Sequence, residues 1–135
     1  MTVPALVTDT SAWIAIQRAA PEAAAFANLI GSAHTVLIAA PTRLECFVVA
    51  LRAQSLTQAH NLMALIAAAR AETVPFDDDL LALAQDAYAR YGRGNGAGGA
   101  LNFGDCFAYA LAKSRGLPLL FKGEDFRATD VEAAA

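Results

Sequence analysis

Four acidic residues adjoin strongly apolar segments of the chain: Asp9, Glu45, Asp105 and Asp125. Two carboxylates about 4 Å apart repel by roughly 4 kcal/mol at an effective dielectric constant near 20, so a cluster of them persists when a divalent cation neutralises it. Carboxylate and water oxygens suit Mg²⁺ or Mn²⁺, whereas Zn²⁺ prefers His or Cys. Such a cation lowers the pKa of a bound water and offsets charge on a phosphate in the transition state. The four acids therefore predict hydrolysis of phosphodiester bonds, in RNA or in DNA.

Glu45 is the hardest of the four to explain as a structural residue, because it lies inside a predicted helix between Leu44 and Cys46. Its helical neighbours three and four positions away are all uncharged: Pro41, Thr42, Val48 and Val49. A carboxylate without a partner beside an apolar stripe is costly unless a tertiary cation or a metal meets it.

The other three acids have a structural alternative that the sequence leaves open. Asp9 and Asp105 each precede a helix, and either could serve as its N-cap. Asp125 lies in the predicted turn KGEDF, where aspartate is common and where Glu124 is a competing candidate. Read together, the acids favour a metal site over four separate structural roles.

The histidines and cysteines do not compete for a metal. His34 and His60 stand apart without ligand spacing, and we interpret them as structural or surface residues. Cys46 and Cys106 are far apart and form no CxxC motif, so we expect a reduced, cytoplasmic protein in which both act as small apolar fillers.

Composition limits the possible function classes. The 135 residues are 56% hydrophobic and 17% charged, which favours one densely packed domain over residues 1–135 and excludes a disordered chain. No apolar run reaches the roughly 18 residues of a membrane span, and the N-terminus lacks the basic leader of a signal peptide. The net charge of −3 argues against a generic nucleic-acid binder, although six of the ten basic residues lie from Arg90 onward and could form a local cationic rim.

Buried strands alternate with helices along the chain, which predicts an α/β fold with a mostly parallel sheet. We expect strands over residues 5–9, 35–39, 72–76 and 117–121. We expect helices over residues 10–18, 21–30, 41–53, 56–71, 77–91 and 105–115, with Pro21 opening the second helix and Gly31 ending it. The glycine-rich stretch 92–99 is expected to be a flexible loop. Because sites gather at the carboxyl ends of parallel strands, Asp9 and Asp125 should meet at one edge of the sheet.

Four segments of the chain resemble the motifs of a known family. The segments VTDTSA, the Glu45 helix, LNFGDCFAYALA and FKGEDFRATDV resemble the four acidic motifs of PIN-domain ribonucleases. More narrowly, they resemble the VapC toxins of bacterial type II toxin–antitoxin pairs, in order and spacing over nearly the whole chain. One departure is GNGAGGA at residues 94–100, where family members often carry a His-Pro or other bulkier element.

The resemblance implies an α/β/α sandwich with metal-dependent endoribonuclease activity, a homodimer, and a cognate VapB-like antitoxin that blocks the active site. Carried over by position, Asp9 and Asp105 would bind Mg²⁺, with Mn²⁺ as a possible substitute. Glu45 and Asp125 would complete the metal's surroundings or orient the attacking water. Residues that would hydrogen-bond within the site are Thr10, Ser11 and Asn102. Asp130 is a further candidate.

Three other functions fit the sequence less well than a nuclease. A phosphoacceptor receiver domain needs an aspartate after its third strand, but no acid lies between Glu45 and Glu72. A haloacid-dehalogenase-like phosphatase needs a DxD pair at its first strand, which DTS lacks. A catalytically idle PIN-like dimeric adaptor is the remaining alternative, and the presence of all four acids argues against it.

Overall fold

Four parallel strands form the centre of the molecule in the computed structural model, which describes residues 4–95 and 98–135. They are β1 (Ala5–Thr8), β2 (Thr35–Ala39), β3 (Glu72–Val74) and β4 (Leu119–Leu120), in the order β3-β2-β1-β4. The first strand pairs with both β2 and β4. The carboxyl ends of β1 and β4 therefore lie side by side, as the sequence predicted.

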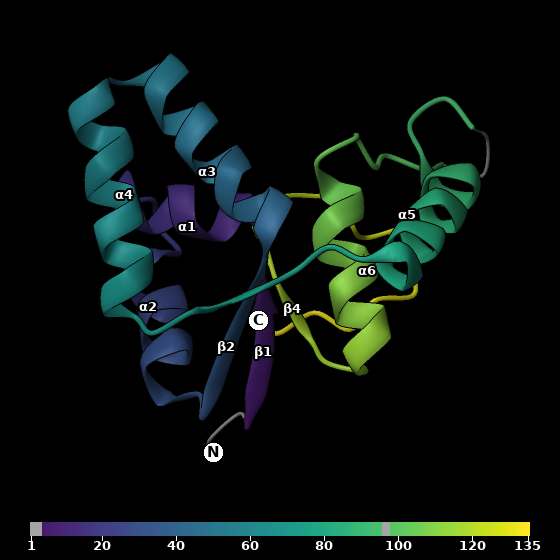
Figure 1. Ribbon diagram of the computed structural model, residues 1–135, viewed down its shortest axis with the longest axis horizontal. Coiled ribbons are helices and arrows are strands. Elements are labelled where there is room, and N and C mark those ends of the chain that lie inside the picture. Colours follow the sequence, from purple (N-terminus) through teal and green to yellow (C-terminus); the bar gives the residue numbers. More distant parts are fainter. Residues whose placement is uncertain (1–3, 96–97) are drawn as a thin grey trace.

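Six helices cover the two faces of this sheet: α1 (Thr10–Gln17), α2 (Ala23–Ser32), α3 (Ala40–Ala53), α4 (Leu56–Ala68), α5 (Asp78–Tyr91) and α6 (Asp105–Arg115). The first four helices lie on one side of the sheet, and α5 and α6 lie on the other (Figure 1). Alternate strand residues serve the two sides: Leu6 packs in the core with α1 to α4, and Val7 in the core with α5 and α6. This is the predicted three-layer α/β/α sandwich.

Several predicted boundaries were wrong. The second helix begins at Ala23 rather than at Pro21, and it runs through Gly31 to Ser32, since that glycine has no left-handed φ to end it. The fourth helix ends at Ala68 instead of residue 71, where Arg70 takes a positive φ of 59°. The fourth strand is shorter than the predicted residues 117–121, because Pro118 cannot donate to a strand ladder, whereas the third strand lies within the predicted residues 72–76.

Helix α6 is the most deeply buried helix of the right-hand layer in Figure 1. Seven of its eleven residues are buried, and Gly116 ends it in the left-handed conformation with φ 63°, as predicted. Its first residue is Asp105. The burial of the helix against both the sheet and α5 fixes the position of that acid.

The glycine-rich loop before α6 is closed at its base. Leu101 N donates to Tyr91 O at 3.0 Å, and Arg93 N donates to Leu101 O at 2.9 Å. Residues 96–97 lie outside the described part of the chain, so the flexibility expected of this loop stays a prediction. In the described residues, no helix is long and apolar enough to cross a membrane.

Candidate active site

Asp9 directly follows β1 and is the N-cap of α1. Its Oδ2 atom accepts hydrogen bonds from Ser11 N at 3.0 Å and from Ser11 Oγ at 2.6 Å. The other oxygen, Oδ1, is buried and has no hydrogen-bond partner among the described residues. Asp9 thus fills the structural role that the sequence left open, and it still carries one buried acceptor that this role does not use.

Ser11 joins the two ends of the sequence at the site. Its hydroxyl donates to Asp9 and accepts a hydrogen bond from Lys122 N at 2.9 Å. Asp9 N also donates to Leu120 O at 3.0 Å. These bonds hold the start of α1 against the segment after β4, which leads to Asp125.

Asp105 is held by a reciprocal pair of hydrogen bonds. Asn102 N donates to Asp105 Oδ2, and Asp105 N donates to Asn102 Oδ1, both at 2.9 Å. The arrangement is that of a capping box, with Asn102 supplying the capping oxygen. The prediction that Asp105 could be the N-cap of a helix from residue 106 was wrong, since Asp105 is the first residue of α6 and its carboxylate accepts from Asn102 N.

Glu45 is half-buried on α3 and reaches the same region from the other side. Thr10 Oγ1 donates a short hydrogen bond of 2.5 Å to Glu45 Oε1. A Cβ atom placed on Gly104 would lie only 2.0 Å from Glu45 Oε2, so the carboxylate packs directly against the glycine that precedes Asp105. No Lys or Arg forms an ion pair with Glu45 in the described part of the chain.

The pKa values tie these acids into one electrostatic group. Burial raises the pKa of Asp9 to about 6; the negative charge of Glu45 raises it further, and the hydrogen bonds from Ser11 oppose the rise. Burial also raises the pKa of Asp105 to about 8; Asn102 N opposes this rise, and the charges of Asp9 and Asp125 add to it. Charge interactions therefore link Glu45 to Asp9, Asp9 to Asp105, and Asp105 to Asp125.

Two other acids that the sequence left open have partners elsewhere. Glu124 is exposed and forms an ion pair with Arg127. Asp130 accepts a hydrogen bond from Tyr109 Oη at 2.5 Å and pairs with Lys113 Nζ at 3.1 Å. Neither acid joins the group around Asp9.

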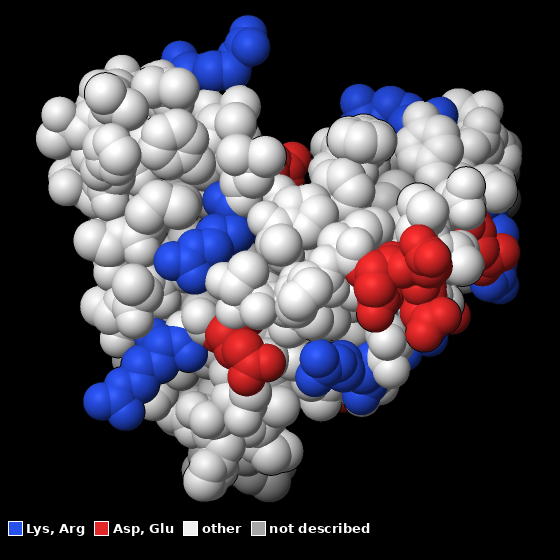
Figure 2. All heavy atoms as spheres, in the orientation of Figure 1, with Lys and Arg blue, Asp and Glu red and all other residues white. Residues whose placement is uncertain are grey.

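The predicted cationic rim is largely neutralised. Four of the six basic residues that would form it make ion pairs with acids: Arg90, Lys113, Lys122 and Arg127. On the face seen in Figure 2, Lys and Arg lie in separate small groups. The same view shows a notch between α3 and α6, with acidic atoms at its floor.

The donor set fits a hard cation bound largely by water. Across residues 4–95 and 98–135, no three His, Cys, Asp or Glu side chains are arranged to hold a metal ion by themselves. Mg²⁺ does not require such a cage, because it keeps several waters and is usually bound through one or two carboxylates and substrate phosphates. The buried Oδ1 atom of Asp9 and the raised pKa values of Asp9 and Asp105 are what two oxygen ligands without their cation would display.

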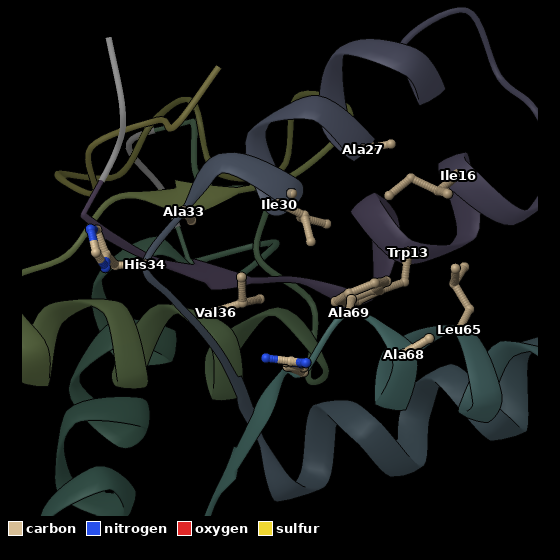
Figure 3. Close-up of a pocket in the computed structure, with 12 residues that line it drawn as sticks. Trp13, Ile16, Ala27, Ile30, Ala33, His34, Val36, Leu65, Ala68 and Ala69 are labelled. Atoms are coloured by element: carbon tan, nitrogen blue, oxygen red, sulfur yellow. The ribbon is translucent and has the colours of Figure 1, made fainter.

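The remaining candidate ligands behave as the sequence predicted. Cys46 and Cys106 are free and buried. His60 packs edge-on against Phe47 with ring centroids 5.6 Å apart. His34 lines a separate cavity of about 590 Å³ between α1, α2 and α4, together with Trp13, Ile30 and Leu65 (Figure 3). None of the four acids lines this cavity, and no motif in the sequence predicted it.

Comparison with known proteins agrees with this geometry. A sequence model of the PIN domain matches residues 6–132. The chain is 41% identical over 129 residues to ribonuclease VapC28 of Mycobacterium tuberculosis, covering 96% of this chain and 97% of that protein. The chain belongs to the PIN-domain family, among the VapC ribonucleases. It is also 39% identical over 128 residues to a ribonuclease VapC of Mycolicibacterium smegmatis, covering 95% and 98% of the two chains.

Solved structures of the VapC family share the fold. The crystal structure of Mycobacterium tuberculosis VapC20, described as a sarcin–ricin loop cleaving toxin, matches with a TM-score of 0.73 at 19% identity, covering 93% of this chain and 95% of that one. VapBC2 from Rickettsia felis, bound to a promoter DNA fragment, matches with a TM-score of 0.72 at 11% identity, covering 96% of each chain. The three-layer architecture is therefore that of this family.

Proposed function

We propose that this chain is the toxin of a type II toxin–antitoxin pair and acts as a Mg²⁺-dependent endoribonuclease that hydrolyses RNA phosphodiester bonds. The observation that carries the proposal is the buried, unpartnered Oδ1 atom of Asp9 in an electrostatic group with Asp105, whose own pKa is raised to about 8. The names of the relatives, ribonucleases of the VapC family, support RNA as the substrate.

In this proposal the residues have distinct roles. Asp9 and Asp105 hold the Mg²⁺, for which Mn²⁺ can substitute, and Glu45 and Asp125 complete its surroundings or orient the attacking water. When bound, the metal supplies Lewis acidity and a more acidic water. Other contacts keep the carboxylates in place: Ser11 to Asp9, Asn102 to Asp105 and Thr10 to Glu45. This chemistry does not need the ribose 2′-hydroxyl as a nucleophile.

The partners follow from the same family. We infer a VapB-like antitoxin that neutralises the toxin in the cytoplasm, because structures of toxin–antitoxin complexes from Klebsiella pneumoniae and Salmonella typhimurium share the fold. We also infer a homodimer. Three large apolar side chains are exposed along one stripe of α3: Leu44, Val48 and Leu51, with 63%, 39% and 40% of their surfaces accessible. An exposed apolar stripe of this kind marks a protein contact.

The direct test is cleavage of structured RNA by the full chain. We expect cleavage with Mg²⁺ or Mn²⁺, none in EDTA, and none with Asp9→Asn. The matched control is Glu124→Gln, which removes a charge that lies outside the acid group. RNA cleavage that survives EDTA would contradict the metal-dependent mechanism. Absence of cleavage with every RNA tried would favour the idle adaptor instead.

A further inference from the structure

An aromatic side chain stands exposed beside the acid group. Phe103 is 78% accessible, the largest value among the exposed large apolar side chains of the described residues. It lies two positions before Asp105, inside the turn that the reciprocal Asn102–Asp105 hydrogen bonds close. Its own carbonyl accepts a hydrogen bond from Cys106 N at 3.3 Å. The backbone of Phe103 is therefore fixed, while its ring faces solvent.

The ring is also supported from behind. Phe103 packs edge-on against Phe107, with ring centroids 5.0 Å apart and an interplanar angle of 82°. Phe107 in turn packs edge-on against Phe76 at 5.2 Å and 85°. This line of three rings connects the exposed Phe103 to the core under α5 and α6. A rigid, supported ring can stack on a planar ligand without a large loss of side-chain entropy.

Phe103 forms one wall of a cavity of about 400 Å³ between α5 and α6. Its other lining residues are Phe76, Leu81, Ala84, Gln85, Tyr88, Cys106 and Phe107. The lining contains no charged side chain, and Asp78 and Asp79 lie in the first turn of α5 nearby. A phosphate would therefore be disfavoured in this cavity, whereas an uncharged aromatic ring would find stacking partners in it.

We propose that this cavity is a nucleobase subsite, in which an unpaired base next to the scissile phosphate stacks on Phe103. The inference rests on the proposed ribonuclease function and specifies how its substrate is held. RNA-binding proteins commonly splay out single-stranded bases and stack them on aromatic side chains. The subsite adjoins the acid group, because Phe103 lies in the turn that the Asn102–Asp105 hydrogen bonds close.

Gln85 gives this subsite the means to select among bases. It is exposed on α5 and contributes the only side-chain amide to the cavity lining. An amide offers both a donor and an acceptor to the edge of a base, while the stacking rings accept any base. Gln85 is therefore the specificity-determining residue of the subsite.

The test couples a change in the protein to a change in the RNA. Single-stranded RNA oligonucleotides carry one abasic nucleotide at successive positions, and kcat/KM and the dissociation constant are measured for the full chain. The dissociation constant is measured by fluorescence anisotropy with Ca²⁺ in place of Mg²⁺. We expect one position beside the cleaved bond where loss of the base weakens binding about tenfold. Phe103→Ala should cost about as much with intact RNA and add nothing with that abasic RNA, because both changes remove the same contact.

Three further variants sharpen the result. Phe103→Trp should restore tight binding, and Gln85→Ala should change the order of preference among the four bases with a smaller loss of affinity. The matched control is Leu56→Ala, which shortens another exposed large apolar side chain, 55% accessible at the start of α4. This control should leave RNA binding unchanged.

Two outcomes would overturn the subsite. The first is that the abasic nucleotide and Phe103→Ala weaken binding independently, so that the combined loss of affinity is the product of the two single losses. The other is a halved molar mass of Phe103→Ala by light scattering, which would assign the ring to contact with a second copy of the chain. If the wild-type chain cleaves no RNA, the ribonuclease proposal fails, and base-dependent binding through Phe103 is still measured by anisotropy. If it cleaves RNA without the expected coupling, the subsite alone fails.

Discussion

Acidic residues lie at both ends of helix α6, and their surroundings differ: one acid has cationic and hydroxyl partners, and the other has acidic neighbours. Near the end of the helix, Asp130 has a donor for each of its oxygens: Tyr109 Oη for one and Lys113 Nζ for the other. The hydrogen bond from Tyr109 lowers the pKa of Asp130 most, and Lys113 lowers it further. At the start of the helix, burial raises the pKa of Asp105 to about 8, and its nearest charged neighbours are other acids.

Asp130 is an acid whose charge stabilises the fold, whereas the charges of Asp9 and Asp105 destabilise it. Asp130 is matched by a hydroxyl and an ammonium group, so its charge needs nothing more. Asp9 and Asp105 are both buried, with 3% and 7% of their surfaces accessible, and neither forms an ion pair within the described residues. Buried carboxylates of this kind are retained when a ligand outside the chain completes them.

The strongest test of this difference is Asp105→Asn. We expect RNA cleavage to fall by about a hundredfold or more, because the substitution removes one of the two charges that would hold the metal. At a pH above about 8, the free energy of unfolding should be no lower than in the wild-type chain, since a buried charge has been removed. Cleavage assays and urea unfolding check the two parts. Retained cleavage would mean that Asp105 is a structural acid like Asp130.

The unpaired acids should also make stability depend on pH. In EDTA, we expect the free energy of unfolding to decrease by several kcal/mol, in order of magnitude, as the pH rises from about 4 to about 8. In the unfolded chain these carboxyls ionise near pH 4, whereas in the folded chain Asp9 keeps its proton to about 6 and Asp105 to about 8. The folded state therefore binds more protons across this window, and its stabilisation is lost as they leave.

Urea unfolding at a series of pH values measures this slope. Added Mg²⁺ should recover stability at the alkaline end, because it binds the ionised acids of the folded chain. The double variant Asp9→Asn, Asp105→Asn should flatten the curve. A wild-type curve that rises across the same window would show that the acids are stabilised by partners within the chain.

Gly104→Ala tests how closely the carboxylate of Glu45 packs against the backbone at residue 104. The added Cβ atom would meet Glu45 Oε2 at 2.0 Å, so Glu45 must move and its bond from Thr10 must change. We expect about a tenfold loss of cleavage and a loss of stability of about 1–3 kcal/mol. Gly31→Ala is the control: a Cβ there meets nothing within 4 Å, and this helical position should gain about 0.5–1 kcal/mol. Equal effects of the two variants would contradict the close packing of Glu45.

Asp130→Asn should lower stability and leave RNA cleavage nearly unchanged, the opposite of what we expect for Asp105→Asn. Loss of the charge weakens the contacts to Tyr109 and Lys113, and we expect a decrease in stability of about 1 kcal/mol with cleavage changed less than about threefold. Thermal unfolding and the cleavage assay measure both. Tyr109→Phe, which removes the same hydrogen bond from the other side, should reproduce the effect. A loss of cleavage as large as that of Asp105→Asn would place Asp130 in the active site.

The smallest effect is expected at Glu124. This acid and its partner Arg127 are both exposed, with side-chain accessibilities of 78% and 70%. Exposed ion pairs contribute little, so Glu124→Gln should match the wild-type chain in both thermal unfolding and RNA cleavage. A measurable loss of cleavage would show that Glu124 belongs to the active site together with Asp125.

The sequence predicted a site at the four acids because each adjoins an apolar segment and because together they suit a metal. Glu45 lies between apolar residues without a helical cation partner, and Asp9 follows an apolar strand. The order of strands and helices, and hence the three-layer fold, could likewise be predicted from alternating apolar segments. Each of these signals is contained in a short stretch of chain, where residue type and spacing are sufficient evidence.

The contacts that assemble the site could not be predicted in this way. Only the fold brings Glu45 against Gly104. The bond from Lys122 N to Ser11 joins residues 111 positions apart. The start of α2 was misplaced because Pro21 is a favourable first helical residue, whereas here it lies in the turn before the helix. Tertiary contacts, rather than local preference, decide these features.

The central position of β1 has a consequence for how the protein is made. This strand lies between β2 and β4, and Asp9 is fixed partly by Leu120 and Lys122, which are synthesised near the end of the chain. A ribosome that has completed the first hundred residues has made Asp9 and Glu45 but neither Asp105 nor Asp125. The nascent chain therefore cannot assemble the acid group before Asp105 and Asp125 have been made. A protein proposed to cut RNA would thus lack that capacity until residue 125 has been made.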